Sequence, residues 1–352
     1  MDCTARSWSA VAKASEGPPG GLRVRGRLIN PKVTRDLFLI GSGKGAGGCV
    51  LYNFCHLFQF CDPANLNARF DPVDIEAISI QTLLAKILQL NLQMKGPLSY
   101  IGGKNRIATK IIGIFPEHKT FVEVFAGGAQ VLFHKEPSSV EVLNDIDADV
   151  VTFFRVCQSH YEELVRYMKF MVASREWFDL LESQDPKTLT DIQRASRFFY
   201  LQKNAYAGLV RKRKFGYAIE EPSRFNPERL PELIENTYAR LVRVQIESLP
   251  YEDILRRYDR PTTLFYLDPP YFGRKLYRFN FSESDFKELA LRLSKLRGMF
   301  VLSLNDLPEV RALFSHFRLQ EIELPYTAQR NPGKRYRELL ITNFPHPQKG
   351  QR

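Results

Sequence analysis

Short apolar strands alternate with helical patterns through residues 94–352, and this alternation restricts the fold more than any other feature of the chain. A helix between two strands carries the chain back to the end where the next strand begins, so such strands pair in parallel. The predicted strands are Phe121–Phe125, Val140–Asp145, Val244–Glu247, Thr263–Leu267, Met299–Ser303 and Glu338–Thr342. The pattern predicts an α/β fold with a mostly parallel sheet.

The middle of this region has a different character. Helical patterns at Tyr161–Phe170 and Arg194–Gln202 are followed by the basic turn Arg211–Lys214 and by proline-rich connections. We interpret this stretch as a helical domain inserted into the sheet domain. The predicted domains are a sheet domain at residues 94–152 and 243–346, a helical insert at 153–242 and a tail at 347–352.

Residues 1–93 form a predicted N-terminal extension. They contain a Pro/Gly-rich opening and the glycine cluster Gly41–Gly48, in which Lys44 is followed by glycine and not by the Ser or Thr that a phosphate loop needs. A flexible linker is the better interpretation of this cluster. Met94 directly precedes the first motif that can be interpreted, so we expect Met94 to be an alternative start and the extension to be poorly ordered or non-essential.

Composition restricts the partners and the location. Lys and Arg total 50 against 39 Asp and Glu, a net charge of +11, which favours a polyanion such as nucleic acid as partner, although a basic protein without such a partner has equal weight. No apolar run reaches the roughly 18 residues of a membrane span, and no secretory signal opens the chain, so we expect a cytoplasmic protein. The spacing of Cys49, Cys55 and Cys61 lacks the short pairs of a zinc site, so we expect no metal.

The most informative motif is Asp268-Pro269-Pro270-Tyr271, directly after the apolar strand Thr263–Leu267. Ligands of an open parallel sheet bind outside the carboxyl ends of its strands. The two prolines hold the backbone extended, so the Asp268 carboxylate and the Pro269 carbonyl present two acceptors side by side, which suits an amino group. Tyr271 offers a face on which a planar base stacks with about 1–3 kcal/mol. The alternative is an acidic turn closed by an aromatic side chain.

A glycine turn follows the strand Phe121–Phe125. Gly127-Gly128-Ala129 would let the backbone approach a ligand closely, although any turn from strand to helix uses glycine. The turn gains weight from Asp145, which ends the next strand, where an acid accepts hydrogen bonds from ribose hydroxyls. Asp147 and Asp149 are better explained as acids of the first turn of a helix.

A second pair of glycines lies upstream, in Ser99–Asn105, ahead of the helical stretch Ile107–Ile114. Glycines before a helix expose backbone donors, and Lys104 offers a cation for a carboxylate. The alternative is an ordinary helix N-terminus with a solvated lysine.

The order of these motifs resembles a known family. Tyr100-x-Gly-Gly-Lys, Phe125-x-Gly-Gly-Ala, a helical insert and Asp268-Pro-Pro-Tyr are similar to the Dam-type (class alpha) DNA adenine-N6 methyltransferases over about residues 97–344. The resemblance implies a doubly wound, Rossmann-like sheet that binds S-adenosylmethionine and carries a helical target-recognition domain. It also implies double-stranded DNA as substrate, no metal, a monomer in the cytoplasm of a bacterium or of a phage host, and a cognate restriction endonuclease as candidate partner.

The resemblance also assigns residues. The implied cofactor-binding residues are Tyr100, Lys104, Phe125, Gly127, Asp145 and Asp268, the implied catalytic residues are Asp268, Pro269 and Tyr271, and phosphate contacts are expected from Arg211, Lys212, Arg213 and Lys214. Tyr100 stands where many relatives have Trp and still allows stacking. Ala129 replaces the last glycine of the usual pattern, at little cost if its φ is negative.

The implied reaction is methyl transfer to the exocyclic amine of an adenine flipped out of duplex DNA. Asp268 and the Pro269 carbonyl would draw the amino hydrogens out of the ring plane and so raise the electron density on nitrogen. The same pair would serve cytosine N4. A catalytically silent DNA-binding relative and an RNA or protein methyltransferase are further candidates, and the insert and the basic turn favour DNA as the substrate. The recognition sequence and the presence of an endonuclease stay open.

Overall fold

The computed structural model describes residues 23–24, 27–28, 95–217, 220, 222–324 and 336–345. The chain divides into two units, residues 1–81 and 82–352. The described part of the first unit is an antiparallel pair of two-residue strands, β1 (Arg23–Val24) and β2 (Arg27–Leu28). The glycine cluster, the cysteines before residue 94, Met94 and the tail lie outside the described residues, so the predictions about them stay predictions.

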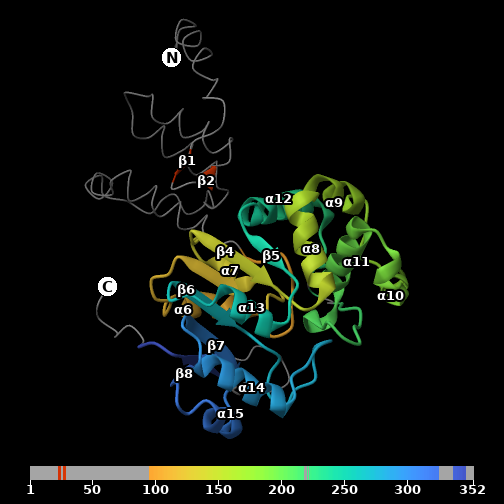
Figure 1. Cartoon of the computed structure of the whole chain (residues 1–352). Coiled ribbons are helices and arrows are strands. Elements are labelled where there is room, and N and C mark those ends of the chain that lie inside the picture. Colours follow the sequence, from red (N-terminus) through yellow and green to blue (C-terminus); the bar gives the residue numbers. More distant parts are fainter. Residues whose placement is uncertain are drawn as a thin grey trace, which may run out of the picture. The chain divides into compact units, whose positions relative to one another are not determined.

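The second unit is built on a seven-stranded sheet (Figure 1). Its strands are β3 (Thr120–Glu123), β4 (Val140–Asn144), β5 (Gln245–Glu247), β6 (Thr263–Leu267), β7 (Met299–Asn305), β8 (Arg318–Leu324) and β9 (Tyr336–Thr342). The spatial order is β5-β4-β3-β6-β7-β9-β8, and only β9 runs antiparallel to its neighbours β7 and β8. The predicted α/β class with a mostly parallel sheet is confirmed, and all six predicted strands are present.

Both faces of the sheet are covered, because successive side chains of each strand point to opposite sides. On β6, Leu264 and Tyr266 join one apolar core, and Phe265 and Leu267 join the other. The first core contains residues of α6 (Ala108–Ile112), α7 (Gln130–His134) and α8 (Ala148–Ser159). The second contains residues of α13 (Tyr251–Tyr258), α14 (Glu283–Ser294) and α15 (Pro308–Leu313). The sheet is therefore doubly wound.

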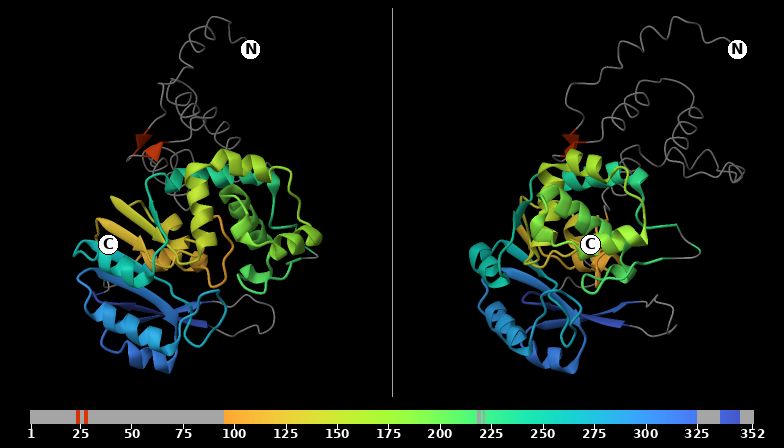
Figure 2. Two further views of the ribbon diagram at one scale, coloured as in Figure 1. Left: turned by 45° about the vertical axis from the view of Figure 1, so that its right-hand side comes forward. Right: turned by 90° about the vertical axis from the view of Figure 1, so that its right-hand side faces the viewer.

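The chain between β4 and β5 is helical, as predicted. It holds α8, α9 (Tyr161–Met168), α10 (Arg175–Ser183), α11 (Asp191–Asn204) and α12 (Leu230–Leu241), which gather beside the β4–β5 edge of the sheet (Figure 2). The predicted boundary at residues 152 and 153 falls inside α8, which is continuous from the sheet into the insert. α11 begins before the predicted stretch because Thr190 and Gln193 form a capping box at its N-terminus.

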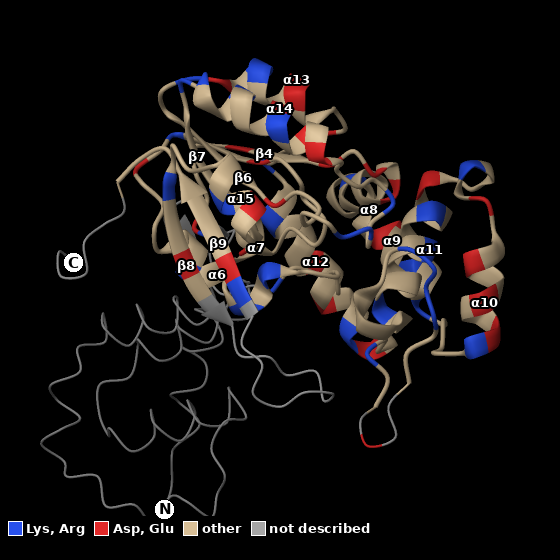
Figure 3. Ribbon diagram, turned by 90° about the horizontal axis from the view of Figure 1, so that it is seen from below, with Lys and Arg blue, Asp and Glu red and all other residues tan. Residues whose placement is uncertain are grey.

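The strand order places a ligand-binding crevice at β3, because open parallel sheets bind ligands where the direction of winding reverses. β3 has β4 on one side and β6 on the other, so the chain winds in opposite directions from β3, and the carboxyl ends of these three strands border a crevice. Acidic and basic residues are mixed along α14, whereas α10 carries three acidic residues and a single basic one, Arg175, at its N-terminus (Figure 3). None of the described helices is long and apolar enough to cross a membrane.

Candidate active site at the carboxyl ends of the strands

One pocket occupies this crevice, and the six residues predicted to bind a cofactor all line it. They come from the segment before α6, from the turns after β3 and β4, and from the end of β6. The six residues are Tyr100, Lys104, Phe125, Gly127, Asp145 and Asp268. The structure thus brings together residues that lie up to 168 positions apart in the sequence.

The turn after β3 is fastened to the turn after β4. The Gly127 amide donates to Asp145 Oδ2 at 2.8 Å, and the Asp147 amide donates to Asp145 Oδ1 at 2.8 Å. Gly127 has φ +46°, and a Cβ atom there would lie 3.0 Å from the Tyr100 ring, so this position requires glycine. Burial raises the pKa of Asp145 to about 6, although these amide donors lower it. The Asp145 carboxylate can still accept from a further donor.

The condition under which Ala129 would cost little, a negative φ, is not met. Ala129 precedes α7 with φ 49° and ψ 33°, in the left-handed region. The chain must turn from β3 into α7 within a few residues, and the Ala129 amide donates to the Ala126 carbonyl at 2.6 Å in that turn. A left-handed conformation costs alanine about 1–2 kcal/mol, so the fold keeps the turn at this cost.

Lys104 is a buried lysine with carboxylate partners inside the protein. Its Nζ lies 2.7 Å from Asp268 Oδ1 and 3.2 Å from Glu338 Oε1, and its side chain is 4% exposed. Burial lowers the pKa of Lys104, but Asp268 and Glu338 outweigh burial and raise it well above its usual value, so the ammonium is charged. The alternative of a solvated lysine is wrong.

Asp268 stands at the end of β6 with one oxygen occupied by Lys104. Burial raises the pKa of Asp268, the Lys104 ammonium lowers it and Glu338 raises it, with a net value of about 6. The carboxylate is therefore ionised at neutral pH. Oδ1 accepts from Lys104, which leaves Oδ2 to accept from a ligand in the pocket.

The Tyr271 hydroxyl is hydrogen-bonded to the same cluster of charged side chains, Lys104 and Glu338. Its hydroxyl donates to Glu338 Oε2 at 2.7 Å and accepts from Lys104 at 3.2 Å. The next residue, Phe272, is bound through its backbone to Asn305, whose side chain accepts from the Phe272 amide at 3.0 Å and donates to its carbonyl at 3.2 Å. The ring of Tyr271 is half-buried, and its stacking on a base and the role of the Pro269 carbonyl stay predictions.

Several residues of the site were not predicted. The Tyr277 ring stacks on Tyr100 with centroids 6.4 Å apart, and Arg278 reaches Asp149 at 2.6 Å and Asp147 at 3.3 Å. Tyr277 and Arg278 both line the pocket. Asp147 is the N-cap of α8 and Asp149 lies in its first turn, as expected. No local pattern marks Tyr277 or Arg278, because only long-range contacts bring their loop to the pocket.

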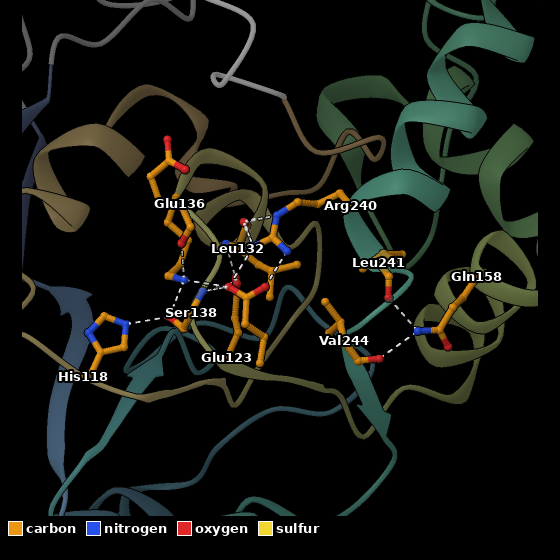
Figure 4. A network of polar contacts seen from close by, with 11 residues as sticks. His118, Glu123, Leu132, Glu136, Ser138, Gln158, Arg240, Leu241 and Val244 are labelled. Atoms are coloured by element: carbon orange, nitrogen blue, oxygen red, sulfur yellow. Dashed lines mark hydrogen bonds and ion pairs between the residues drawn. The ribbon is translucent and has the colours of Figure 1, made fainter. Parts of the chain in front are cut away.

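Glu123 is a further unpredicted residue of the pocket wall. It ends β3, is buried, and accepts from the Leu132 amide at 2.8 Å (Figure 4). Burial raises its pKa to about 8. Beside it in register on β6, the Tyr266 hydroxyl is buried without a hydrogen-bond partner among the described residues. The sequence signal that could have identified Glu123 is its position as the single acidic residue in the apolar strand Phe121–Phe125.

The basic turn divides its side chains. Arg211, Lys212 and Lys214 are exposed. Arg213 is buried, and its guanidinium donates to Gln202 at 3.1 Å and to Glu182 at 3.1 Å. The prediction that all four side chains contact DNA is therefore wrong for Arg213, whose guanidinium binds residues inside the helical insert.

The fold and this pocket define a Rossmann-like α/β enzyme with a carboxylate and an aromatic ring beside a ligand cavity. The family model described as D12 class N6 adenine-specific DNA methyltransferase matches residues 100–328, and the chain belongs to this family. The resemblance to adenine methyltransferases is confirmed, and the chain is an adenine-specific DNA methyltransferase whose substrate is DNA. The family assignment selects adenine over the alternative of cytosine N4.

Individual relatives agree with the family. The type II methyltransferase M.CviBI of Paramecium bursaria Chlorella virus NC1A is 24% identical over 260 residues, 71% of this chain and 98% of that protein. The type II methyltransferase M1.LlaDCHI of Lactococcus lactis subsp. cremoris is 25% identical over 73% of this chain and 99% of that protein. A DNA adenine methylase of Serratia marcescens is 24% identical over 66% of this chain and 92% of that protein.

Proposed function

We propose that this enzyme takes its methyl group from S-adenosylmethionine and transfers it to N6 of an adenine flipped out of double-stranded DNA, with Asp268 as the acceptor for the amino group. The observation that carries the proposal is the convergence of six separate residues, Asp268 among them, on one pocket at the switch point of the sheet.

The pocket has features that fit the cofactor. The Tyr266 hydroxyl is buried and lacks a partner among the described residues, so a polar ligand atom would satisfy it. Gly127 lets a ligand approach the backbone, Asp145 would hold the ribose, and Tyr100 and Phe125 supply apolar walls. When bound, the cofactor supplies an electrophilic methyl group on a sulfonium.

Asp268 and Pro269 act on the adenine. Asp268 Oδ2 and the Pro269 carbonyl each accept one hydrogen of the amino group, which concentrates electron density on N6. The nitrogen gives up one proton on methylation, and the Asp268 carboxylate receives it. Because the pKa of Asp268 is about 6, this carboxyl releases the proton to water at neutral pH.

The insert and the loops act on the DNA. The exposed side chains of Arg211, Lys212 and Lys214 would contact phosphates and so place the helical insert as a target-recognition domain. Tyr271 would stack on the flipped base. We also propose a monomeric enzyme of the bacterial cytoplasm, encoded by the bacterium or by a phage, with a cognate restriction endonuclease as candidate partner.

The test combines wild type with two variants. We expect the protein, incubated with S-adenosylmethionine and unmethylated genomic DNA, to leave N6-methyladenine at a short recurrent sequence, as read by single-molecule sequencing. Asp268→Ala should bind S-adenosylhomocysteine but lose at least about 100-fold in kcat. Asp253→Ala, on the exposed face of α13, should match wild type. Wild-type protein that binds the cofactor and methylates no adenine would contradict the proposal, and an active Asp268→Ala would remove this residue from the mechanism.

A further inference from the structure

A buried carboxylate on β9 lies behind the catalytic turn and belongs to none of the motifs considered above. Glu338 is 2% exposed. Its Oε1 accepts from the Ser303 hydroxyl at 2.5 Å and lies 3.2 Å from Lys104 Nζ, and its Oε2 accepts from the Tyr271 hydroxyl at 2.7 Å. Oε1 therefore lies beside Lys104, which contacts Asp268, and Oε2 is bound to Tyr271, which follows Asp268 in the same turn.

The sheet places this carboxylate accurately. Glu338 is the register partner of Asn305 in the antiparallel pairing of β9 with β7. Asn305 holds both backbone groups of Phe272, and Ser303, two residues earlier on β7, holds Glu338. The turn that carries Asp268 and Tyr271 is thus supported from the ends of two paired strands, which are rigid elements.

The charges in this group are unequal in number. Asp268 and Glu338 are two carboxylates that share the single ammonium of Lys104. If Asp268 were the single partner of the Lys104 ammonium, most of its negative charge would be compensated. It would then accept a hydrogen bond from the substrate more weakly. Because Glu338 takes part of the Lys104 charge, Asp268 keeps negative charge on the oxygen that faces the pocket.

We propose that Glu338 is a positioning residue for adenine methylation, which orients Lys104 and Tyr271 and leaves Asp268 a strong acceptor for the target amino group. This inference rests on the proposed role of Asp268 and adds a residue that touches neither cofactor nor substrate. Glu338 acts through Lys104 and Tyr271, so its removal should affect the chemical step and not the binding of either ligand.

The test is Glu338→Gln, which keeps the size and removes the charge. We expect kcat for adenine methylation to fall about 10- to 100-fold, because small displacements of reacting groups have effects of this order, while KM for cofactor and for DNA stays unchanged. Glu321→Gln makes the same chemical change at an exposed position of the neighbouring strand β8 and should match wild type.

A second readout separates this role from a structural one. Lys104 and Glu338 are the charged groups that set the pKa of Asp268, and Glu123 on β3 is neutral at neutral pH. Loss of the Glu338 charge should lower the pKa of Asp268, so the acidic limb of the kcat profile should move to lower pH. Tyr271→Phe combined with Glu338→Gln should cost less than the sum of the two single changes.

The outcomes are distinguishable. An active wild type with an inactive Asp268→Ala and a Glu338→Gln that keeps kcat and its pH profile would overturn this inference and leave the proposed function intact. A fall in kcat with an unmoved acidic limb in a folded variant would also overturn it. If Glu338→Gln unfolds, Ser303→Ala replaces it: loss of that hydroxyl should lower kcat in the same direction, and unchanged kcat would contradict the inference.

Discussion

The absence of a side chain at Gly127 leaves room for the Tyr100 ring at the edge of the pocket. Gly127→Ala would combine a left-handed backbone with a Cβ atom 3.0 Å from the Tyr100 ring, so the ring must move away from the cofactor site. We expect the affinity for S-adenosylhomocysteine to fall at least about tenfold, or 1.4 kcal/mol, in titration calorimetry.

Gly273 provides the matched control for this variant. It has φ +71°, and a Cβ atom there would meet nothing within 4 Å. Gly273→Ala therefore carries the backbone cost without the contact and should keep wild-type affinity. Equal losses in the two variants would show that backbone strain, and not the Tyr100 contact, determines binding.

Glu123 makes stability depend on pH. Its pKa is about 8 in the folded chain and close to its ordinary value of 4.5 in the unfolded chain, so the unfolded state ionises first as pH rises. Between about pH 4.5 and 8 the folded state of wild type therefore loses about 1.4 kcal/mol per pH unit through this residue. Glu123→Gln cannot ionise and should become progressively more stable than wild type over this window.

Denaturant unfolding of both proteins at several pH values measures this difference. The Leu132 amide keeps an acceptor in the glutamine variant, so the variant should match wild type near pH 4.5. A difference that stays constant from pH 4.5 to 8 would contradict the raised pKa of Glu123.

At the scale of elements, Arg240 joins α12 to the sheet. Its guanidinium donates to the Leu132 carbonyl of α7 at 2.7 Å (Figure 4). It also donates to Glu141 of β4 at 2.5 and 2.9 Å. Arg240→Ala should lower the free energy of unfolding by about 2–3 kcal/mol, because it removes buried hydrogen bonds to the Glu141 carboxylate, which keeps only Lys135 as a charged partner. Arg155→Ala removes an exposed pair with Asp191 and should cost under about 1 kcal/mol in the same denaturant titration. Equal effects would contradict a special role for Arg240.

The elements that could be predicted are those with an unambiguous local pattern. β6 is an unbroken apolar run, and its predicted bounds agree with the structure. The start of α11 was predicted three residues late, because the capping box of Thr190 and Gln193 was not used. β8 was missed because it is an edge strand whose one strongly buried described residue, Ile322, lies among charged side chains. Asp268 was identified because it follows β6 directly, whereas Glu338 lies inside β9 and acquires its partners only through the sheet.

For the whole molecule, all strands of the seven-stranded sheet and all six predicted cofactor residues follow residue 94. We expect a chain of residues 94–352 to methylate adenine with the kcat of the full chain, as measured by transfer of a labelled methyl group to DNA. A folded but inactive fragment would contradict this expectation and would give residues 1–93 a part in the reaction.

The antiparallel strand β9 also sets the moment at which the enzyme can begin to work. Lys104 enters the growing polypeptide early, Asp268 and Tyr271 follow much later, and Glu338 is among the last described residues to be synthesised. Until β9 inserts between β7 and β8, Lys104 lacks the second of its two carboxylate partners, and the Tyr271 hydroxyl lacks its acceptor. Chains that are unfinished or truncated before β9 should therefore not methylate DNA.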